Sequence, residues 1–516
     1  MIRTRVAPLV LTLVAILCTV PAPAHGAWPH PTTANLPVCT ATATQRWAAL
    51  AADGAGGILV AWMDGRGADW NIYIQRVSAD GTPLWTADGV PVCTATGSQT
   101  YPVLAGDGAG GAIVAWEDQR PDDGGAYAQR ISADGTPLWT TDGVRLCAAA
   151  NGQSEITIVP TLPAYAGAAN GAILLWKEDR TGVDEDLYAQ EISPDGILQW
   201  PVSGLPICLS SGSPSGTRMI PDGEGGAVAV WYDTRSDGDV YAQRIHPSGI
   251  TWWGDNGYPL CTASGYQTAP SLAPDGTGGA IVSWSDNRIG DWNIYAQRIS
   301  GGGVTAWTTD GVPLCIATAG QWLSTTASDG LGGAFVFWLD QRNGLGDVYG
   351  QRVSSAGVAL WTTNGVPVCT VSGEQSNVLA VPDGTGGALV AWLDSRGGPT
   401  NVYLQRFSAS GAAQWAADGV PVCTASGGQS DLQLLADGLG GGFAAWADRR
   451  AGDWDIYAQR VDRWGCLGAE PMIASVRDIP NDEGGRVKLS WDASPLDTDV
   501  LFESIGTYRV YRSVPA

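Results

Sequence analysis

Short apolar runs alternate with glycine-rich polar turns along most of the chain, without the 3.6-residue period of an amphipathic helix. The run 112–116 is apolar at successive positions, which predicts a strand with both faces buried. A first strand is predicted at 101–105, before the turn 107–111, and a third at 126–131. Short strands joined by Gly and Asp turns indicate an all-β fold.

The same pattern recurs eight times, with 53 to 60 residues between equivalent tryptophans. A tryptophan marks the second predicted strand of each copy: Trp62, Trp116, Trp176, Trp231, Trp284, Trp338, Trp392 and Trp446. A tyrosine marks the third: Tyr73, Tyr127, Tyr188, Tyr241, Tyr295, Tyr349, Tyr403 and Tyr457. A cysteine marks the fourth: Cys39, Cys93, Cys147, Cys208, Cys261, Cys315, Cys369 and Cys423. Three interlocked series at one spacing establish an internal repeat.

Four short strands per unit, two-sided burial and eight units predict an eight-bladed β-propeller over residues 35–466. The fourth strand is expected at 137–147 in the second unit. A β-solenoid is the alternative, but its repeats are usually shorter. The eighth unit ends at 464–466 without a fourth strand, and an isolated strand precedes the first unit at 36–39. We therefore expect this N-terminal strand to complete the last blade, which leaves no free edge.

Residues 1–27 have the order of a secretory signal. Arg3 and Arg5 precede an apolar run, and small residues follow, with cleavage expected after Ala24 or Ala27. The apolar run is too short to span a bilayer comfortably. We predict export, to the cell surface or beyond, with no membrane insertion of the mature chain.

The periodicity stops after Gly468. The segments 473–478, 485–491 and 508–512 resemble the first three strands of a fibronectin type III domain. This resemblance covers 471–516, roughly half of a sandwich of about 100 residues, so we expect the natural chain to continue. The whole sequence resembles secreted bacterial propeller repeat proteins that carry such a domain.

The net charge of the chain limits the classes of binding partner that we expect. With 28 Lys and Arg against 51 Asp and Glu, the net charge is −23, which repels phosphates and argues against nucleic acid and anionic membranes. The histidines are His25, His30 and His246, and the first two lie at or next to the signal segment, which argues against zinc sites rich in histidine. We expect a monomer without a cofactor.

An acidic and a basic residue follow the repeated tryptophan at a fixed spacing. The pairs include Asp64 and Arg66, Asp118 and Arg120, Asp286 and Arg288, and Asp448 and Arg450. Such arginines can bind ligand carboxylates, as those of sialidase propellers do. Because the pair recurs in nearly every unit, whereas a catalytic site would break the symmetry, we predict that each pair fixes a loop of its own blade.

The segment 78–85 resembles the Asp-box of sialidases and the turn-and-Trp motif of quinoprotein propellers. It departs from the Asp-box because Gly81 directly follows Asp80 instead of standing one residue later. In both families the element is a turn that stabilises a blade. The resemblance therefore implies that Trp85 packs between blades, and it implies nothing about chemistry.

The repeated Asp-Gly-x-Gly-Gly turns are weak candidates for calcium sites, because one carboxylate per turn is few for six to eight oxygen ligands. Hairpin turns are the simpler interpretation. The repeated cysteines should lie about 10 Å or more apart on neighbouring blades, whereas a disulfide requires Cα atoms within about 7 Å. We therefore predict buried free thiols.

Aromatic residues that break the repeat are the candidate ligand-binding residues. They lie in loops between the second and third strands or in the connections between blades, which share one face: Trp70, Trp292, Trp454, Trp47, Tyr101, Tyr266 and Trp322. Exposed aromatics beside polar residues suit stacking on sugars or capture of a protein loop. The alternative is that each ring only covers a neighbouring loop.

These features favour a non-catalytic binding or scaffold protein that presents one propeller face to a glycan or protein ligand. A structural or adhesion protein and a carbohydrate-active enzyme are the alternatives. A glycosidase would need two carboxyls about 5–10 Å apart at the channel. The strands predicted to line the channel are nearly free of acids, with Glu155 and Asp431 as exceptions.

Overall fold

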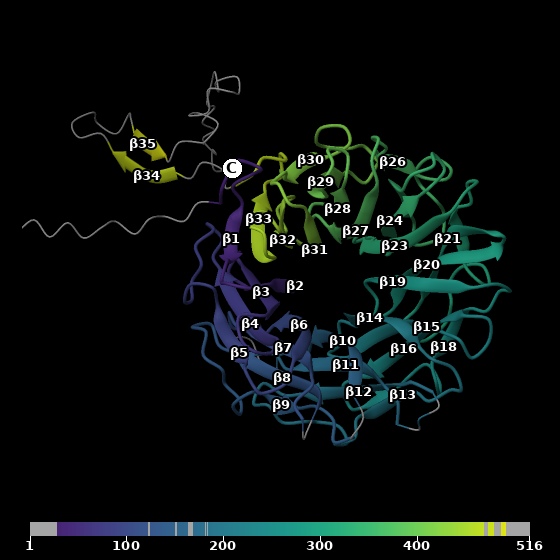
Figure 1. Cartoon of the computed structure of the whole chain (residues 1–516). Coiled ribbons are helices and arrows are strands. Elements are labelled where there is room, and N and C mark those ends of the chain that lie inside the picture. Colours follow the sequence, from purple (N-terminus) through teal and green to yellow (C-terminus); the bar gives the residue numbers. More distant parts are fainter. Residues whose placement is uncertain are drawn as a thin grey trace, which may run out of the picture.

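The computed structural model describes residues 28–468 except 122–123, 150–151, 164–168, 181 and 183, and the backbone of 473–478 and 487–491. In this part of the chain, eight antiparallel sheets follow one another round a common centre (Figure 1). The eight-bladed β-propeller predicted from the repeat is confirmed. No helix within the described ranges is long and apolar enough to cross a membrane.

Each blade contributes one strand to each of four positions, counted outward from this centre. The innermost strands are β2 (Gln45–Ala52), β6 (Gln99–Gly106), β10 (Gln153–Pro160), β14 (Ser215–Pro221), β19 (Gln267–Pro274), β23 (Gln321–Ser328), β27 (Gln375–Pro382) and β31 (Gln429–Ala436). The second strands are β3 (Ile58–Asp64), β7 (Ala112–Asp118), β11 (Ala172–Glu178), β15 (Ala227–Asp233), β20 (Ala280–Ile289), β24 (Ala334–Asp340), β28 (Ala388–Asp394) and β32 (Gly442–Asp448). The third strands are β4 (Asn71–Val77), β8 (Gly125–Ile131), β12 (Asp186–Ile192), β16 (Asp239–His246), β21 (Asp291–Ile299), β25 (Asp347–Val353), β29 (Asn401–Phe407) and β33 (Asp455–Val461). The outer strands are β5 (Val90–Cys93), β9 (Val144–Arg145), β13 (Leu205–Cys208), β17 (Ile250–Thr251) with β18 (Tyr258–Cys261), β22 (Val312–Cys315), β26 (Val366–Cys369), β30 (Val420–Cys423) and, for blade eight, β1 (Leu36–Cys39).

The second strands form the core. In β3, β24, β28 and β32 every residue is buried, and the repeated tryptophans have no exposed surface. Burial of both faces follows from the continuous apolar runs, because each blade is packed between two neighbours. The repeated tyrosines stack on these tryptophans in several blades, for example Tyr127 on Trp116 with ring centroids 6.3 Å apart.

The outer strand differs from the continuous strand expected at 137–147. In blade two it consists of a single bridge at Pro137 and the short strand β9. A tight turn separates the two pieces, with the Gly143 N–H donating to the carbonyl of Thr140. Asp142 and Gly143 have φ angles of 59° and 90°, which an extended strand cannot accommodate.

The N-terminal strand completes blade eight, as the end of the repeat predicted. Strand β1 pairs antiparallel with β33, with Leu36 opposite Ala458 and Pro37 opposite Tyr457 (Figure 1). Trp28, which precedes the range 35–466, is also part of the propeller. Its indole is fully buried, and its ring centroid lies 5.6 Å from that of Phe443.

Trp28 belongs to a ring of eight indoles that join neighbouring blades. The Trp85 N–H donates to the carbonyl of Ala133 in the next blade, and Gly135 of the same turn lies against the Trp85 ring. A Cβ at Gly135 would come within 3.0 Å of that ring, so the glycine of this turn allows the close approach. The equivalent indole donors are Trp28, Trp139, Trp200, Trp253, Trp307, Trp361 and Trp415.

Beyond the propeller, strands β34 (Ile473–Asp478) and β35 (Val487–Trp491) form an antiparallel pair. Both lie where the first two strands of the fibronectin-like segment were predicted. The third predicted strand, 508–512, and the signal segment 1–27 lie outside the described residues.

Candidate functional site

Every innermost strand contains a β-bulge near its N-terminal end, just after the chain enters the blade from the preceding one. In each blade one residue of the innermost strand has a positive φ angle, between 49° and 63°: the second residue after the Gln that begins this strand, or its equivalent in blade four. We call these residues the mouth ring: Trp47, Tyr101, Glu155, Gly216, Ala269, Leu323, Asn377 and Asp431. Glycine accommodates this conformation freely, whereas for a bulky residue such as Trp or Leu it is strained. Such strain is often associated with functional sites.

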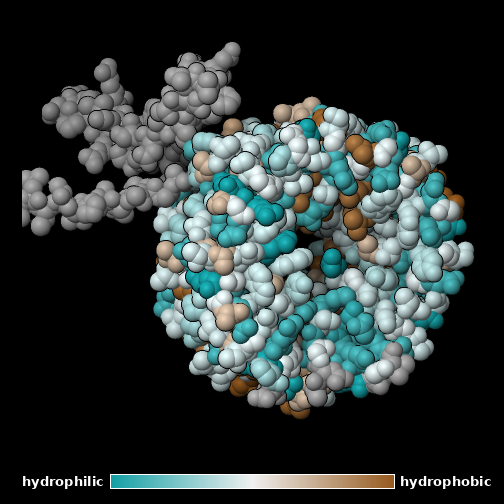
Figure 2. Space-filling model, viewed as in Figure 1, coloured by the Kyte–Doolittle hydropathy of each residue, from teal (hydrophilic) through white to brown (hydrophobic). Residues whose placement is uncertain are grey.

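The mouth ring surrounds the opening of the central channel. All eight residues line two cavities of about 900 and 670 Å³. The cavities share Glu155, Ile156, Arg218 and Asn377, so they are parts of one hollow at the centre of the propeller. Figure 2 shows this hollow, where hydrophilic and hydrophobic residues lie side by side. Its volume suits an organic ligand of moderate size.

Two aromatic rings stand together on one side of the mouth. Trp47 and Tyr101 meet edge to face, with centroids 5.2 Å apart, and remain 43% and 48% exposed. Because they project from the bulges of neighbouring blades, their relative position is fixed by the propeller. The pair offers an apolar platform to a ligand in the larger cavity.

Asp431 is held next to this aromatic pair. Its carboxylate accepts hydrogen bonds from Arg46 Nε at 3.0 Å and Nη2 at 3.1 Å, and from the Trp47 N–H at 3.1 Å. The Arg46 guanidinium also lies 5.5 Å from the ring of Trp47 and 5.0 Å from that of Trp454. This bidentate ion pair joins blades eight and one across the seam.

A second group of carboxylates lies at blades two and three. Glu155 Oε1 pairs with Lys177 Nζ at 2.9 Å, and its Oε2 accepts the Gly216 N–H at 3.1 Å. Lys177 also pairs with Glu185 at 3.0 Å. The Glu155 N–H donates to Glu117 at 3.0 Å. Burial, reinforced by the charge of Glu155, raises the pKa of Glu117.

The seven aromatic residues that the sequence predicted as ligand-binding residues do not form one site in the structure. Trp47 and Tyr101 line the channel cavities, and the other five do not. Tyr266 is exposed outside them. The remaining four are half-buried: Trp70, Trp292, Trp322 and Trp454.

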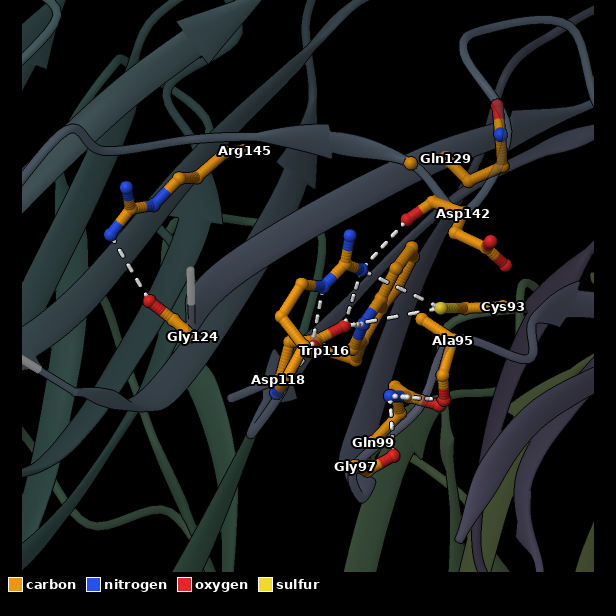
Figure 3. Close-up of polar contacts among 12 residues, drawn as sticks. Cys93, Ala95, Gly97, Gln99, Trp116, Asp118, Gly124, Gln129, Asp142 and Arg145 are labelled. Atoms are coloured by element: carbon orange, nitrogen blue, oxygen red, sulfur yellow. Dashed lines mark hydrogen bonds and ion pairs between the residues drawn. The ribbon is translucent and has the colours of Figure 1, made fainter. Parts of the chain in front are cut away.

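The repeated Asp–Arg pairs lie away from the channel cavities. In blade two, Asp118 Oδ2 accepts Arg120 Nη2 at 2.6 Å and the Trp116 indole N–H at 2.8 Å (Figure 3). The Arg120 guanidinium lies 3.8 Å from the centroid of the Tyr127 ring. The Asp118–Arg120 pair also contacts the preceding blade, because Arg120 Nη2 lies 3.7 Å from Cys93 Sγ in β5. Equivalent ion pairs include Asp64 with Arg66, Asp286 with Arg288 and Asp448 with Arg450.

The repeated cysteines are free and buried, as predicted, and Cys466 is exposed. Burial raises the pKa of Cys93 to about 12, so its thiol stays protonated and unreactive at neutral pH. The Asp-Gly-x-Gly-Gly turns use their carboxylates internally: Asp53 accepts the N–H groups of Ala55 and Gly57 and pairs with Arg76. Within the described part of the chain, no cluster of three metal-binding side chains occurs.

Blade three departs from the pattern. In the other blades an arginine of the third strand, such as Arg76, pairs with the turn Asp, whereas blade three has Glu191. No ion pair of Glu191 occurs among the described residues, and burial raises its pKa to about 7. Because the folded protein binds this proton more tightly than the unfolded chain, the contribution of Glu191 to stability is full below about pH 4 and is lost as the pH rises towards 7.

The Glu191→Gln variant is therefore expected to be more stable than the wild type at pH 8, and to differ little at pH 4.5. We expect the free energy of unfolding to increase by about 1–2 kcal/mol at pH 8. This is less than the pKa shift alone would give, because solvent screens a half-buried group. Urea unfolding at both pH values measures the difference. Glu374→Gln, at an exposed position, is the matched control. An equal effect at both pH values would contradict the role of Glu191 ionisation.

No family model and no curated protein matches the chain. Solved structures resemble it at low identity. A puromycin-hydrolysing peptidase from Mycobacterium tuberculosis is 16% identical, with a TM-score of 0.41, over 82% of this chain and 61% of that one. This chain thus spans about three fifths of the length of the peptidase. An ulvan lyase, a polysaccharide lyase, is 10% identical, with a TM-score of 0.41, over 86% of this chain and 97% of that one. These likenesses concern the fold alone.

Proposed function

We propose that the protein is a non-catalytic glycan-binding propeller whose site is the mouth of the central channel. The observation that carries the proposal is the half-exposed pair of Trp47 and Tyr101, held edge to face at the opening of the 900 Å³ cavity. The pair interrupts a mouth ring that has small or aliphatic residues on the opposite side, at Gly216, Ala269 and Leu323. A site restricted to one side is typical of ligand binding rather than of blade packing.

The chemistry of the mouth suits a sugar. A sugar ring has an apolar C–H face, which stacks on an aromatic ring, and hydroxyl edges, which need donors and acceptors. Trp47 and Tyr101 supply the apolar surface, and Asn377, Glu155 and Asp431 supply polar groups in the same cavity. The ion pairs of both carboxylates keep these groups in place without removing their capacity to accept further hydrogen bonds.

The proposal includes the cellular setting expected from the sequence. On the signal-like segment 1–27 we propose export, with the mature chain acting as a monomer at the cell surface or outside the cell. The segment 471–516 then serves as part of a fibronectin-like spacer. A protein loop as ligand and a purely structural role are the alternatives that a glycan-binding assay tests.

A glycan array with the purified chain tests the proposal. We expect wild-type protein to bind a defined subset of glycans, and Trp47→Ala and Tyr101→Ala each to weaken binding at least about tenfold, since each removes a stacking surface. Trp464→Ala is the matched control, because Trp464 is 69% exposed and lies outside the channel cavities. Absence of glycan binding, or equal losses in the control variant, would reject the proposed site.

A hydrolase is the second candidate, favoured by one observation. Glu117, whose pKa is raised, and Glu155, which is ion-paired, lie in one cavity, and glycosidases use one protonated and one ionised carboxyl. Incubation of the bound glycan with wild-type protein and with Glu117→Gln decides between the candidates. Release of new reducing ends that depends on Glu117 would replace the binding function with a hydrolytic one.

A further inference from the structure

We propose that the channel site selects an anionic saccharide, one that carries a carboxylate or sulfate group, and that Arg218 binds this group inside the channel. The inference rests on the proposed glycan-binding function and deepens it by naming the class of glycan. It starts from a second ring of residues, deeper in the channel than the mouth ring.

The second ring occupies the first paired position after the bulge in each innermost strand. The registers of the eight blades place these residues at equivalent sites: Ala49, Val103, Thr157, Arg218, Ser271, Thr325, Leu379 and Gln433. All eight line the channel cavities. Arg218 is the charged member of this ring, and it lines both cavities, so a ligand that enters from the mouth meets its guanidinium.

Arg218 differs from the other arginine of the innermost strands. Arg46 is held by Asp431 in a bidentate ion pair. Arg218 is exposed in the channel, and its one hydrogen bond to a described residue goes from Nη1 to the Thr217 carbonyl at 2.9 Å. It forms no ion pair with any described residue. Four of the five guanidinium N–H groups therefore remain for a ligand, in a geometry that suits a carboxylate or sulfate.

The acidic residues of the mouth form no ion pair with Arg218 in the described part of the chain. Asp431 is paired with Arg46, and Glu155 is paired with Lys177, which it shares with Glu185. Burial raises the pKa of Glu117, and its carboxyl group accepts the Glu155 N–H at 3.0 Å. Arg218 is thus a channel cation that forms no ion pair among the described residues. A local site of this kind attracts an anionic group even though the whole chain carries a net charge of −23.

Hydroxyl groups flank Arg218 in the second ring. Thr157 on blade three lines the cavity, but its hydroxyl oxygen is buried away from the cavity surface. On blade five, the hydroxyl oxygen of Ser271 accepts the Thr326 N–H at 3.0 Å, which leaves its proton free to donate. These residues line the 670 Å³ cavity together with Arg218. A guanidinium with an adjacent hydroxyl donor, here that of Ser271, is chemistry that suits an oxyanion.

Matched pairs of oligosaccharides test the inference with the full chain. The probes are oligogalacturonate with its methyl ester, and a sulfated galactan oligomer with its desulfated form, each titrated calorimetrically. We expect at least one anionic member to bind about tenfold or more tightly than its neutral counterpart. This preference should disappear in Arg218→Met, persist in part in Arg218→Lys, and decrease with added salt. The pair that shows it identifies carboxylate or sulfate as the group recognised.

Arg449→Met is the matched control, because Arg449 is an exposed arginine outside both cavities whose Nε donates to the Gly452 carbonyl. It should leave the preference unchanged. Equal binding of neutral and anionic members that still requires Trp47 would overturn the role of Arg218 while the proposed function stands. A preference for the anionic oligosaccharide that survives in Arg218→Met would also overturn the role of Arg218 and leave the proposed function standing. Failure of every probe and every arrayed glycan to bind would overturn the proposed function and this inference together.

Discussion

A chain that lacks residues 28–39 is expected to lose most of its stability, because these residues close the ring. They supply the outer strand of blade eight, β1, and the fully buried indole of Trp28. They also supply the seam contacts of Arg450 Nη2 with Asn35 at 2.9 Å and of Arg66 Nη2 with Cys39 Sγ at 3.2 Å. Without them, β33 becomes a free edge strand, which favours aggregation.

The point variant Trp28→Ala isolates the largest part of this effect. Truncation of a fully buried Trp costs about 3–5 kcal/mol, so a loss of that size in the free energy of unfolding is expected. Urea unfolding followed by tryptophan fluorescence measures it, with Trp464→Ala, at an exposed position, as the control that should change by less than about 0.5 kcal/mol. Unchanged stability of the truncated chain would show that the ring does not depend on this closure.

The Asp118→Asn variant is expected to lose about 2–3 kcal/mol of stability. Asp118 accepts hydrogen bonds from the Arg120 backbone and side chain and from the Trp116 indole, and its own side chain is fully buried. The substitution removes the negative charge and leaves the Arg120 guanidinium without its counter-ion. Loss of one partner of a buried ion pair costs about 3–5 kcal/mol, and the partial exposure of Arg120 reduces this value.

A double-mutant cycle with Arg120→Met provides the control for this prediction. Because removal of both charges leaves no unpaired ion, Asp118→Asn combined with Arg120→Met should cost clearly less than the sum of the single variants. Thermal or urea unfolding of the four proteins gives the coupling energy. Additive losses would indicate that the pair contributes through packing alone.

The fold could be predicted because it depends on features that repeat. The tryptophan series fixed the number of blades, and the continuous apolar runs placed the second strands between neighbouring sheets. The break in the outer strand near Thr140 was missed, because the strand pattern does not show that Asp142 and Gly143 adopt positive φ angles. Trp28 was also missed as part of the propeller, since it directly follows the signal segment and stands apart from the repeated motif.

The site was harder to predict, because its decisive feature is a backbone conformation. Trp47, Tyr101, Glu155 and Asp431 were each noted, but nothing in the residue types shows that they occupy the same bulge position in four consecutive blades. Alignment of the innermost strands on the second residue after the initial Gln would have revealed the mouth ring. Arg218 escaped notice because blade four lacks that Gln and cannot be aligned by eye.

The buried cysteines make local opening of the propeller measurable by thiol labelling. Eight cysteines stand at regular intervals round the circumference, one beside each Asp–Arg or Glu–Arg pair, including Cys39 at the seam. A thiol reagent reaches such a sulfur only when the surrounding contacts separate, so the rate of labelling at each cysteine measures how often that sector opens. Peptide mapping after brief exposure to the reagent would rank the sectors in order of opening, without any engineered probe.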